Sequence, residues 1–137
     1  MITKLLILLL IVSVVIPYAD AVPLSDKTGL KFTFPVKTDD HSFTIEVTGN
    51  LDVTNLDFDK DEKSITFFIQ SSLENNSLEI SFPNKLIGGD YTILLDNDET
   101  IPEVQQGNDT TFVTMDFSGT GKHKIEILEL HILISLK

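Results

Sequence analysis

The sequence predicts an all-β protein, an antiparallel β-sandwich of seven to eight strands that follows an N-terminal signal helix. Apolar and polar residues alternate in short runs through residues 42–127, which is the pattern of strands with one buried face. Turn-forming residues separate these runs about every ten residues, as in β-sandwiches. Beyond the N-terminal segment, no stretch has the length and helical period of a substantial helix. A small β-barrel would produce the same pattern and is the alternative fold.

The N-terminal segment, residues 1–21, predicts a secretory signal that is cleaved after Ala21. Lys4 supplies the positive start, and residues 5–16 form a nearly continuous apolar run that a proline ends. Ala19 and Ala21 place small residues at the two positions that a signal peptidase reads. The run is shorter than the roughly 20 residues that a membrane-spanning helix needs. Secretion or display at the cell surface is therefore expected. The alternative is an uncleaved anchor, and only such an uncleaved signal would place the chain in a membrane.

The composition excludes several classes of function. Acidic residues number 21 against ten lysines and no arginine, which gives a net charge of -11 at pH 7. That charge has the wrong sign for binding nucleic acid or anionic lipid, so neither is expected as a partner. The absence of cysteine removes disulfides, thiolate nucleophiles, Cys-based metal sites and a lipoprotein anchor. An exported chain without disulfides depends on the packing of its core, or is exported to a place where disulfides are little used.

Two parts follow the signal. Residues 22–41 form a polar lead-in and a first short strand, and residues 42–137 form the sandwich domain. Alternation predicts strands whose buried positions are Phe43, Ile45 and Val47; Ile65, Phe67 and Ile69; Leu78, Ile80 and Phe82; Tyr91, Ile93 and Leu95; and Val113, Met115 and Phe117. Phe68 falls on the outer face of its strand, so we expect that strand to be covered on both sides.

The segments between the runs predict the connections. Residues 59–63 and 74–76 are expected to be solvated hairpin loops, and residues 96–99 a tight hairpin, because Asp and Asn tolerate positive φ. Residues 83–89 differ: a proline opens the segment, two apolar residues lie inside it and two glycines end it. This pattern predicts a single helical or 3₁₀ turn that caps one end of the core. Further turns are predicted at residues 49–50, 107–109 and 118–121.

The C-terminal segment is ambiguous. Even-numbered residues from 128 to 136 are apolar, whereas the apolar residues Ile125 and Ile127 hold odd positions. A β-bulge after Ile127 would explain this slip of phase. A helix is the competitor, because the apolar residues at 125, 128 and 132 would share a helical face. Whether residues 128–137 form a sandwich strand, a helix or an exposed tail stays open.

The best metal candidate is a run of three aspartates at alternate positions. Oxygen ligands in this arrangement suit a hard cation such as Ca²⁺, the one cofactor considered. An EF-hand loop is excluded, because Glu62 stands where glycine is needed and Phe68 where a bidentate glutamate belongs. A polar hairpin is the alternative interpretation, and residues 96–99 form a second acidic turn of the same kind. The candidate ligands are Asp57, Asp59 and Asp61.

No catalytic or cofactor-binding residue is assigned. The three histidines, His41, His123 and His131, fit no metal-binding or catalytic spacing and are interpreted as ordinary loop or strand residues. The sequence contains no nucleophile elbow, P-loop or dinucleotide fingerprint. Two N-glycosylation motifs fall in predicted turns, with Asn75 and Asn108 as the acceptors, and unmodified polar turns are the alternative.

Four stretches occur in an order that resembles a β-sandwich module of exported and cell-surface proteins of archaea, especially ammonia-oxidising ones. They are residues 56–67, 78–89, 91–96 and 121–127. Such modules are similar to immunoglobulin-like domains. The resemblance therefore implies an immunoglobulin-like sandwich in the cell envelope, with a role in adhesion or assembly and no assigned chemistry.

The chain departs from this family pattern in two places. Asn97 and Asp98 occupy a hairpin where glycine is common. Many relatives end in a Pro-Glu-Phe-Gly sorting segment followed by a membrane anchor, and neither precedes Lys137. The chain is therefore expected to be a freely exported module or one that its partners hold.

The sequence thus predicts an exported, non-catalytic β-sandwich protein of the cell surface or extracellular space, with a structural or interaction role. Its partner would be another protein or a second copy of the chain, paired through strand edges or the apolar tail. The alternative is a calcium- or carbohydrate-binding module that uses the acidic hairpin loops. An enzyme is not expected, because the spacing of the scattered carboxylates supports no catalytic geometry.

Overall fold

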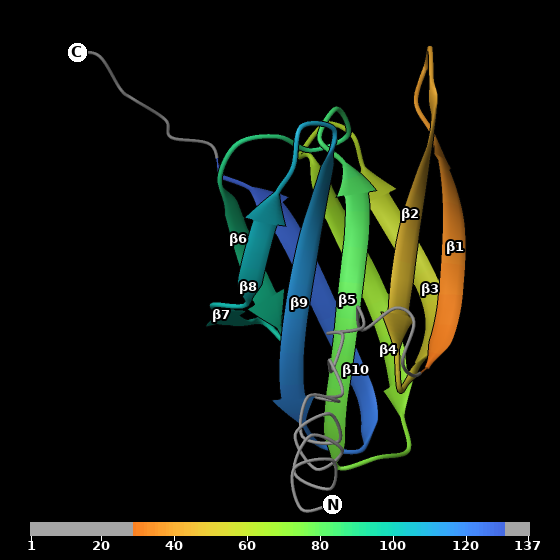
Figure 1. Ribbon diagram of the computed structural model, residues 1–137, viewed down its shortest axis with the longest axis vertical. Helices are drawn as coiled ribbons and strands as arrows, with labels where there is room; N and C mark the ends of the chain where they lie inside the picture. Colours follow the sequence, from red (N-terminus) through yellow and green to blue (C-terminus); the bar gives the residue numbers. More distant parts are fainter. Residues whose placement is uncertain (1–28, 131–137) are drawn as a thin grey trace, which may run out of the picture.

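The computed structural model describes residues 29–130 of the chain. Within this range the chain forms two antiparallel sheets of five strands each, which face one another (Figure 1). The predicted signal helix, the cleavage position after Ala21, most of the lead-in, and His131 with the rest of the tail lie outside the described residues. No helix in the described part of the chain is long and apolar enough to cross a membrane.

The strand order confirms the predicted all-β sandwich. The first sheet contains, in spatial order, β1 (Leu30–Lys37), β2 (Ser42–Gly49), β5 (Asn75–Pro83), β9 (Thr110–Ser118) and β8 (Glu103–Gln106). The second sheet contains β3 (Asp52–Asp59), β4 (Ser64–Ser71), β10 (Gly121–Glu129), β6 (Tyr91–Leu95) and β7 (Asp98–Thr100). The described residues form ten strands where seven to eight are predicted. The additional ones include β7 and β8, which at three and four residues are too short to show a period.

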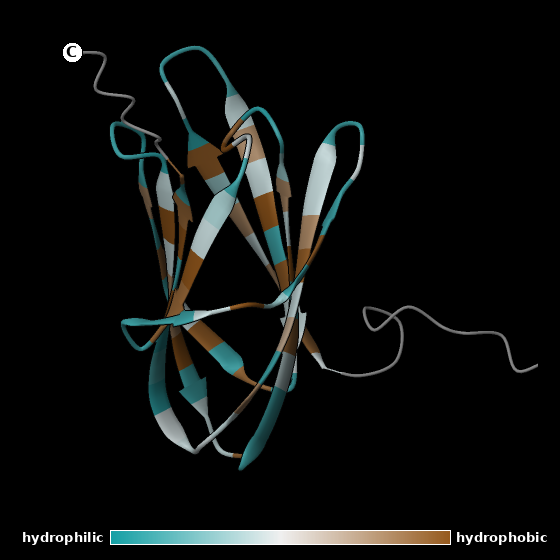
Figure 2. Cartoon of the chain, turned by 90° about the vertical axis from the view of Figure 1, so that its left-hand side faces the viewer, coloured by the Kyte–Doolittle hydropathy of each residue, from teal (hydrophilic) through white to brown (hydrophobic). Residues whose placement is uncertain are grey.

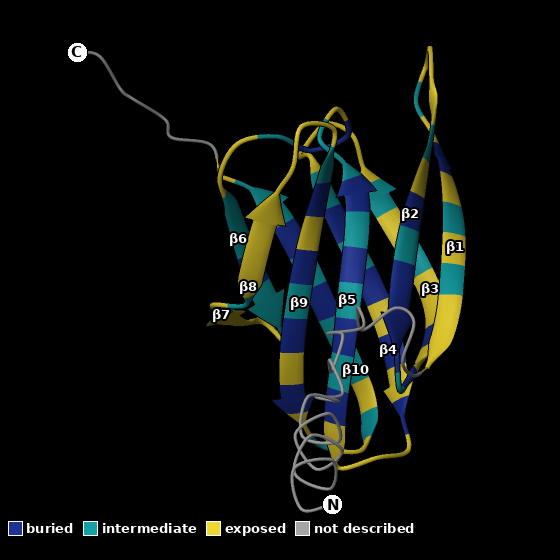
Figure 3. Cartoon of the chain, viewed as in Figure 1, coloured by how far each residue is buried: buried dark blue, intermediate teal, exposed yellow. Residues whose placement is uncertain are grey.

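The two sheets enclose an apolar core between their facing sides. The predicted strands are present, and their predicted inward positions belong to the core or pack against it (Figures 2 and 3). Complete burial of one Val, Leu, Ile, Phe or Met side chain contributes about 1.5–3 kcal/mol to the stability of the fold. Packing can therefore stabilise this fold without disulfides. The fully buried side chains include Ile45, Phe67, Ile80, Phe82 and Ile125.

One predicted hairpin is wrong. Residues 72–74 carry the chain from β4 in the second sheet to β5 in the first, so the polar stretch at 74–76 does not join two paired strands. Asn75 already begins β5. Asn76 is buried, and its side-chain amide donates a hydrogen bond to the Gly119 carbonyl at 2.9 Å. Sequence could not separate the two cases, because turns within and between sheets use the same polar residues.

The corner at residues 83–89 closes one end of the core. The Leu86 N–H donates to the Pro83 carbonyl at 3.0 Å, which makes a single turn. Leu86 and Ile87 are buried, and the Tyr91 hydroxyl donates to the Ile87 carbonyl at 2.9 Å. The predicted apolar cap is therefore confirmed.

Two expectations about strand faces are wrong. Phe68 is 38% exposed on the outer face of β4, so the described residues do not cover that face. The second sheet also has no bulge after Ile127. Ile127 pairs with Ile65 and Leu128 with Ser64 in one continuous register, and β10 ends soon afterwards. The change of phase therefore reflects the end of the strand.

Candidate functional site

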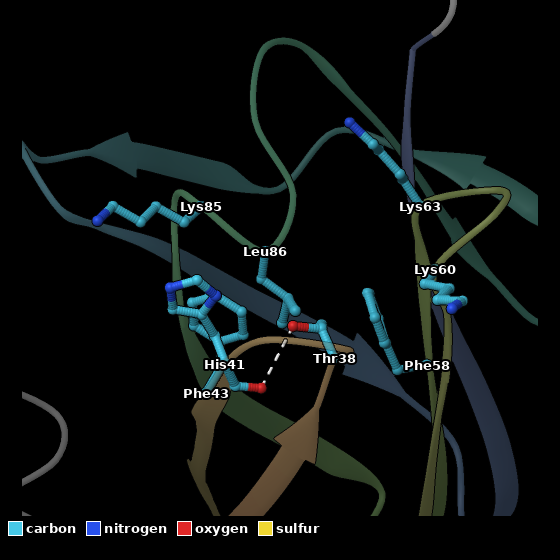
Figure 4. A pocket seen from close by; sticks show the side chains of 8 residues that line it. All are labelled: Thr38, His41, Phe43, Phe58, Lys60, Lys63, Lys85 and Leu86. Atoms are coloured by element: carbon cyan, nitrogen blue, oxygen red, sulfur yellow. Dashed lines mark hydrogen bonds between the residues drawn. The ribbon is translucent and has the colours of Figure 1, made fainter.

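Three loops meet at one end of the sandwich around a cavity of about 350 Å³. They are the β1–β2 loop (residues 38–41), the β3–β4 loop (60–63) and the β5–β6 loop (84–90). Because strand directions alternate along the chain, all three loops fall at the same end (Figure 1). We call this cavity the lysine pocket. Its lining side chains are Thr38, His41, Phe43, Phe58, Lys60, Lys63, Lys85 and Leu86 (Figure 4).

The floor of the lysine pocket is apolar. Phe43 of β2 and Phe58 of β3 are partly buried and pack against the core, and Leu86 is 5% exposed. His41 stacks on Phe43 with ring centroids 6.0 Å apart. Phe43 and Phe58 continue the apolar alternation of their strands to the loop end of the sandwich. A ligand at this end would therefore meet apolar surface below the polar loops.

Three lysines surround this floor, and no carboxylate lines it. The Lys60 ammonium donates to both carboxylate oxygens of Asp39, at 3.0 and 3.2 Å. The hydrogen bond and the negative charge of Asp39 raise the pKa of Lys60. The Lys63 ammonium lies 3.5 Å from the Glu129 carboxylate. Lys85 is exposed and makes no ion pair with any residue that the structure describes.

Local hydrogen bonds fix the loops that carry these lysines. One carboxylate oxygen of Asp59 accepts the backbone N–H groups of Asp61 and Glu62 at 2.9 and 3.1 Å. The backbone N–H and the hydroxyl of Thr38 both donate to the His41 carbonyl, at 2.8 and 3.2 Å. Two of the three loops are therefore closed by hydrogen bonds of their own side chains. These bonds fix the backbone that carries the pocket lining.

The three aspartates predicted to bind calcium are not gathered into a ligand set. Asp57 and Asp59 are exposed in β3, and Asp61 is exposed in the loop that follows. Asp59 instead closes its own hairpin. Within residues 29–130, no three His, Asp or Glu side chains are placed to hold a metal ion. Calcium binding by these residues stays a prediction, which calorimetric titration with calcium chloride would test.

His123 forms an ion pair at the opposite end of the sandwich. Its Nδ1 lies 2.7 Å from a carboxylate oxygen of Asp96, and its Nε2 lies 2.9 Å from the Gly119 carbonyl oxygen. Because both partners accept hydrogen bonds, the doubly protonated imidazolium is the form that satisfies them. The hydrogen bond with Asp96 raises the pKa of His123, although burial opposes this rise.

The same contacts show what the first residue of the acidic turn at 96–99 does: its carboxylate binds His123 and the Lys124 backbone N–H. Burial alone would raise the pKa of Asp96, but the hydrogen bond from His123 and the backbone N–H of Lys124 outweigh it and lower that pKa. The first carboxylate of this turn therefore ties β6 to β10. Asp98 and Glu99 are exposed.

The remaining sequence candidates lie in accessible positions. Asn75 is exposed at the start of β5, and Asn108 is exposed in the turn between β8 and β9. N-glycosylation at these two residues stays a prediction. His41 lines the lysine pocket as a stacked ring, as described above.

Sequence reasoning missed the lysine pocket. Lys60 and Lys85 lie in two polar turns that show no relation along the chain, and only the arrangement of the sheets brings them to one cavity. The available signal was that three of ten lysines fall in predicted turns next to apolar strand ends. A single sequence does not reveal which turns share an end of the sandwich.

Comparison with protein-family models, with curated proteins and with solved structures finds no match for this chain. The geometry of the lysine pocket is therefore the basis on which a function can be argued. An apolar floor surrounded by ammonium groups can bind an apolar group that carries negative charge.

Proposed function

We propose that this chain is an exported, non-catalytic β-sandwich protein that binds another protein at the cell surface or in the extracellular space. The observation that carries the proposal is the lysine pocket, an apolar cavity framed by three loops of a two-sheet scaffold. Loops at the end of a sandwich are common places for binding surfaces. The charged start, apolar run and small residues before position 22 support export.

A binding role without catalysis is supported by the use of the ionisable side chains. Lys60, Asp96 and His123 have shifted pKa values, and each is engaged in a pair that joins separate elements. The Lys60–Asp39 pair connects the β3–β4 loop with the β1–β2 loop. The His123–Asp96 pair connects β10 with the β6–β7 turn. Asp96 and His123 lie away from the pocket, and Lys60 joins two of the loops that frame it, so the pocket offers contacts of shape and charge.

We further propose kinship with the immunoglobulin-like surface modules of archaea, on the basis of the sequence resemblance. The two antiparallel sheets support this kinship at the level of architecture. The strand order differs from that of constant-type immunoglobulin domains, whose second sheet places the third strand beside the sixth. In this chain β3 lies beside β4, and β6 lies between β10 and β7. The kinship therefore predicts envelope placement but not a particular immunoglobulin topology.

Cell fractionation and site-specific photocrosslinking test the proposal together. The full chain, expressed in its own cells, would carry a photoreactive residue at position 85 or, as the control, at position 122. Lys122 is exposed and pairs with Gln70 at the far end of the sandwich. We expect recovery in the envelope or medium and a defined crosslinked protein from position 85 alone. Recovery of the chain in the cytoplasm, or equal products from both positions, would contradict the proposal.

A further inference from the structure

We propose that the lysine pocket binds an acidic segment of a partner protein, with one apolar anchor side chain on the pocket floor and flanking carboxylates at the lysines. This inference rests on the proposed interaction role and specifies the chemistry of the partner. It assigns Phe43, Phe58 and Leu86 to the anchor, and Lys60, Lys63 and Lys85 to the carboxylates.

The shape of the cavity favours an anchor side chain. Its volume of about 350 Å³ lies at the small end of the range for small-molecule sites, which enclose most of their ligand. The lysine pocket is framed by loops and open to solvent between them (Figure 4). An open apolar hollow of this size suits the single buried side chain around which protein interfaces concentrate their binding energy.

The lining of the pocket is basic, whereas the molecule and the loops around the pocket are acidic, because residues 38–41 and 60–63 also carry Asp39, Asp40, Asp61 and Glu62. The chain has a net charge of -11, yet the pocket lining includes three lysines and no carboxylate. Lys85 has no partner among the described residues and is available to an incoming carboxylate. Lys60 and Lys63 are in pairs whose ammonium side chains remain 54% and 51% exposed. The Lys60–Asp39 pair is exposed on both sides and contributes little stability, so its exchange for a partner's carboxylate costs little. Lys63 gives up its pair at a greater cost, because the Glu129 side chain is only 18% exposed.

The lysine side chains are both apolar and charged, so they can contribute to the apolar hollow and to the positive charge of its lining. A lysine can lay its methylene groups along apolar surface while its ammonium stays at the rim. In Figure 4 the Lys60 side chain lies beside Phe58, whereas those of Lys63 and Lys85 lie further out along the rim, with the Lys85 ammonium pointing away from Leu86. An apolar side chain flanked by acidic residues matches the apolar floor of the pocket and the ammonium groups at its rim. A membrane surface does not, because an extended anionic bilayer would also face the acidic remainder of the molecule, whereas a short segment meets the pocket alone.

A peptide titration followed by NMR tests the inference on the full chain as cells process it. The probe is a capped five-residue peptide with a central phenylalanine between two pairs of glutamates. One control peptide replaces the glutamates by glutamines, and another replaces the phenylalanine by alanine. We expect amide shifts confined to residues 38–43, 58–63 and 84–87. We also expect affinity to fall about tenfold for each control peptide and at raised salt.

Two variants of the chain provide the matched comparison. Lys85 is exposed, so the Lys85→Glu variant should fold normally and weaken binding of the acidic peptide about tenfold. Lys122→Glu makes the same change of charge at the other end of the sandwich and should leave binding unchanged. Equal binding of the glutamine peptide, equal loss in both variants, shifts elsewhere on the protein, or no binding at millimolar peptide would each overturn the inference.

The result also separates this inference from the proposed function. A crosslinked partner at position 85 together with no preference for the acidic peptide would leave the interaction role standing and refute the acidic ligand. Size-exclusion chromatography addresses a second copy as the occupant. A concentration-dependent dimer that Lys85→Glu abolishes would place another copy of this chain in the pocket, and the inference of a different protein partner would be wrong.

Discussion

His123 of β10 links its strand to two turns, because its ring contacts the Asp96 carboxylate and the Gly119 carbonyl. Its side chain is 11% exposed, and its ring meets the Phe117 ring edge-on with centroids 5.0 Å apart. The substitution His123→Leu keeps much of the side-chain volume but removes the donors to Asp96 and Gly119. Because Asp96 is 46% exposed and solvent screens it, we expect the free energy of unfolding to fall by about 1–2 kcal/mol. Urea denaturation measures this change.

Lys122→Gln is the control for that variant. It changes the exposed neighbouring residue in the same strand and should alter the free energy of unfolding by less than about 0.5 kcal/mol. A His123→Leu protein as stable as the natural chain would show that the two hydrogen bonds contribute nothing net.

The pKa shifts of the same pair predict how stability depends on pH. The folded-state pKa of His123 is raised above its ordinary value of 6.5, so its stabilisation is complete below that pH and is lost as pH rises through the folded pKa. The pKa of Asp96 is lowered from 3.8, so its stabilisation is present above that pH and is lost as pH falls through the folded pKa. The pair therefore contributes most between about pH 4 and 6.5.

Urea denaturation at pH 5.5 and pH 8.5 checks this dependence. We expect the natural chain to be less stable at the higher pH, and His123→Leu to lose most of that difference. An unchanged pH difference in the variant would assign the effect to other groups, and NMR titration of the His123 ring would then show an ordinary pKa.

Among the structural elements, the β6–β7 hairpin has the most demanding turn. Leu95 pairs with Asp98, and the two residues between them have positive φ, 50° for Asp96 and 72° for Asn97. This is a type I′ turn, whose second central position favours glycine. Asn97→Gly should therefore raise the free energy of unfolding by about 0.5 kcal/mol, and Asn97→Ala should lower it by about 1 kcal/mol. Thermal and urea denaturation of the two variants measure these opposite shifts, and equal effects would contradict the turn assignment.

The elements that could be predicted from sequence are those whose residues alternate. β4, β5 and β9 each place three apolar residues two positions apart, and all nine of these side chains are buried. The turn at 96–97 was predictable because Asp and Asn are among the few residues that tolerate positive φ. Both predictions depend on local chemistry, which one sequence contains.

The elements that could not be predicted depend on contacts between distant segments. Nothing in the composition of residues 72–76 says whether β5 pairs with β4 or crosses to the other sheet. Phe68 has the residue type of a buried position but lies on a face that no described element covers. The lysine pocket is a third case, because its lysines come from loops that only the complete topology places together.

The whole molecule has two ends with different roles. At one end, Asn76, His123 and the Gly119 carbonyl form a hydrogen-bonded network that joins the two sheets. At the other end, three loops leave an apolar cavity rimmed by lysines. The first arrangement stabilises the sandwich, and the second leaves surface available. Substitutions at the two ends should therefore separate stability from binding.

The net charge of the molecule as a whole predicts its response to salt. At -11 the folded chain holds many like charges in a compact volume. Two of the five ion pairs among the described residues, Lys31–Glu46 and Lys60–Asp39, are exposed on both sides. Exposed pairs contribute little, whereas repulsion across the whole surface opposes the compact state. Screening should therefore relieve more repulsion than attraction. We expect a change from about 20 to 500 mM sodium chloride to raise the free energy of unfolding by on the order of 1 kcal/mol.

Urea is the suitable denaturant for this measurement because it adds no ions. The control is the same pair of salt concentrations near the isoelectric point of about 4.4, where net repulsion is small and salt should have much less effect. A loss of stability with salt at neutral pH would mean that specific ion pairs outweigh the net charge. It would then point to the His123–Asp96 pair as the attraction that salt screens, because its side chains lie closest together and one of them is nearly buried.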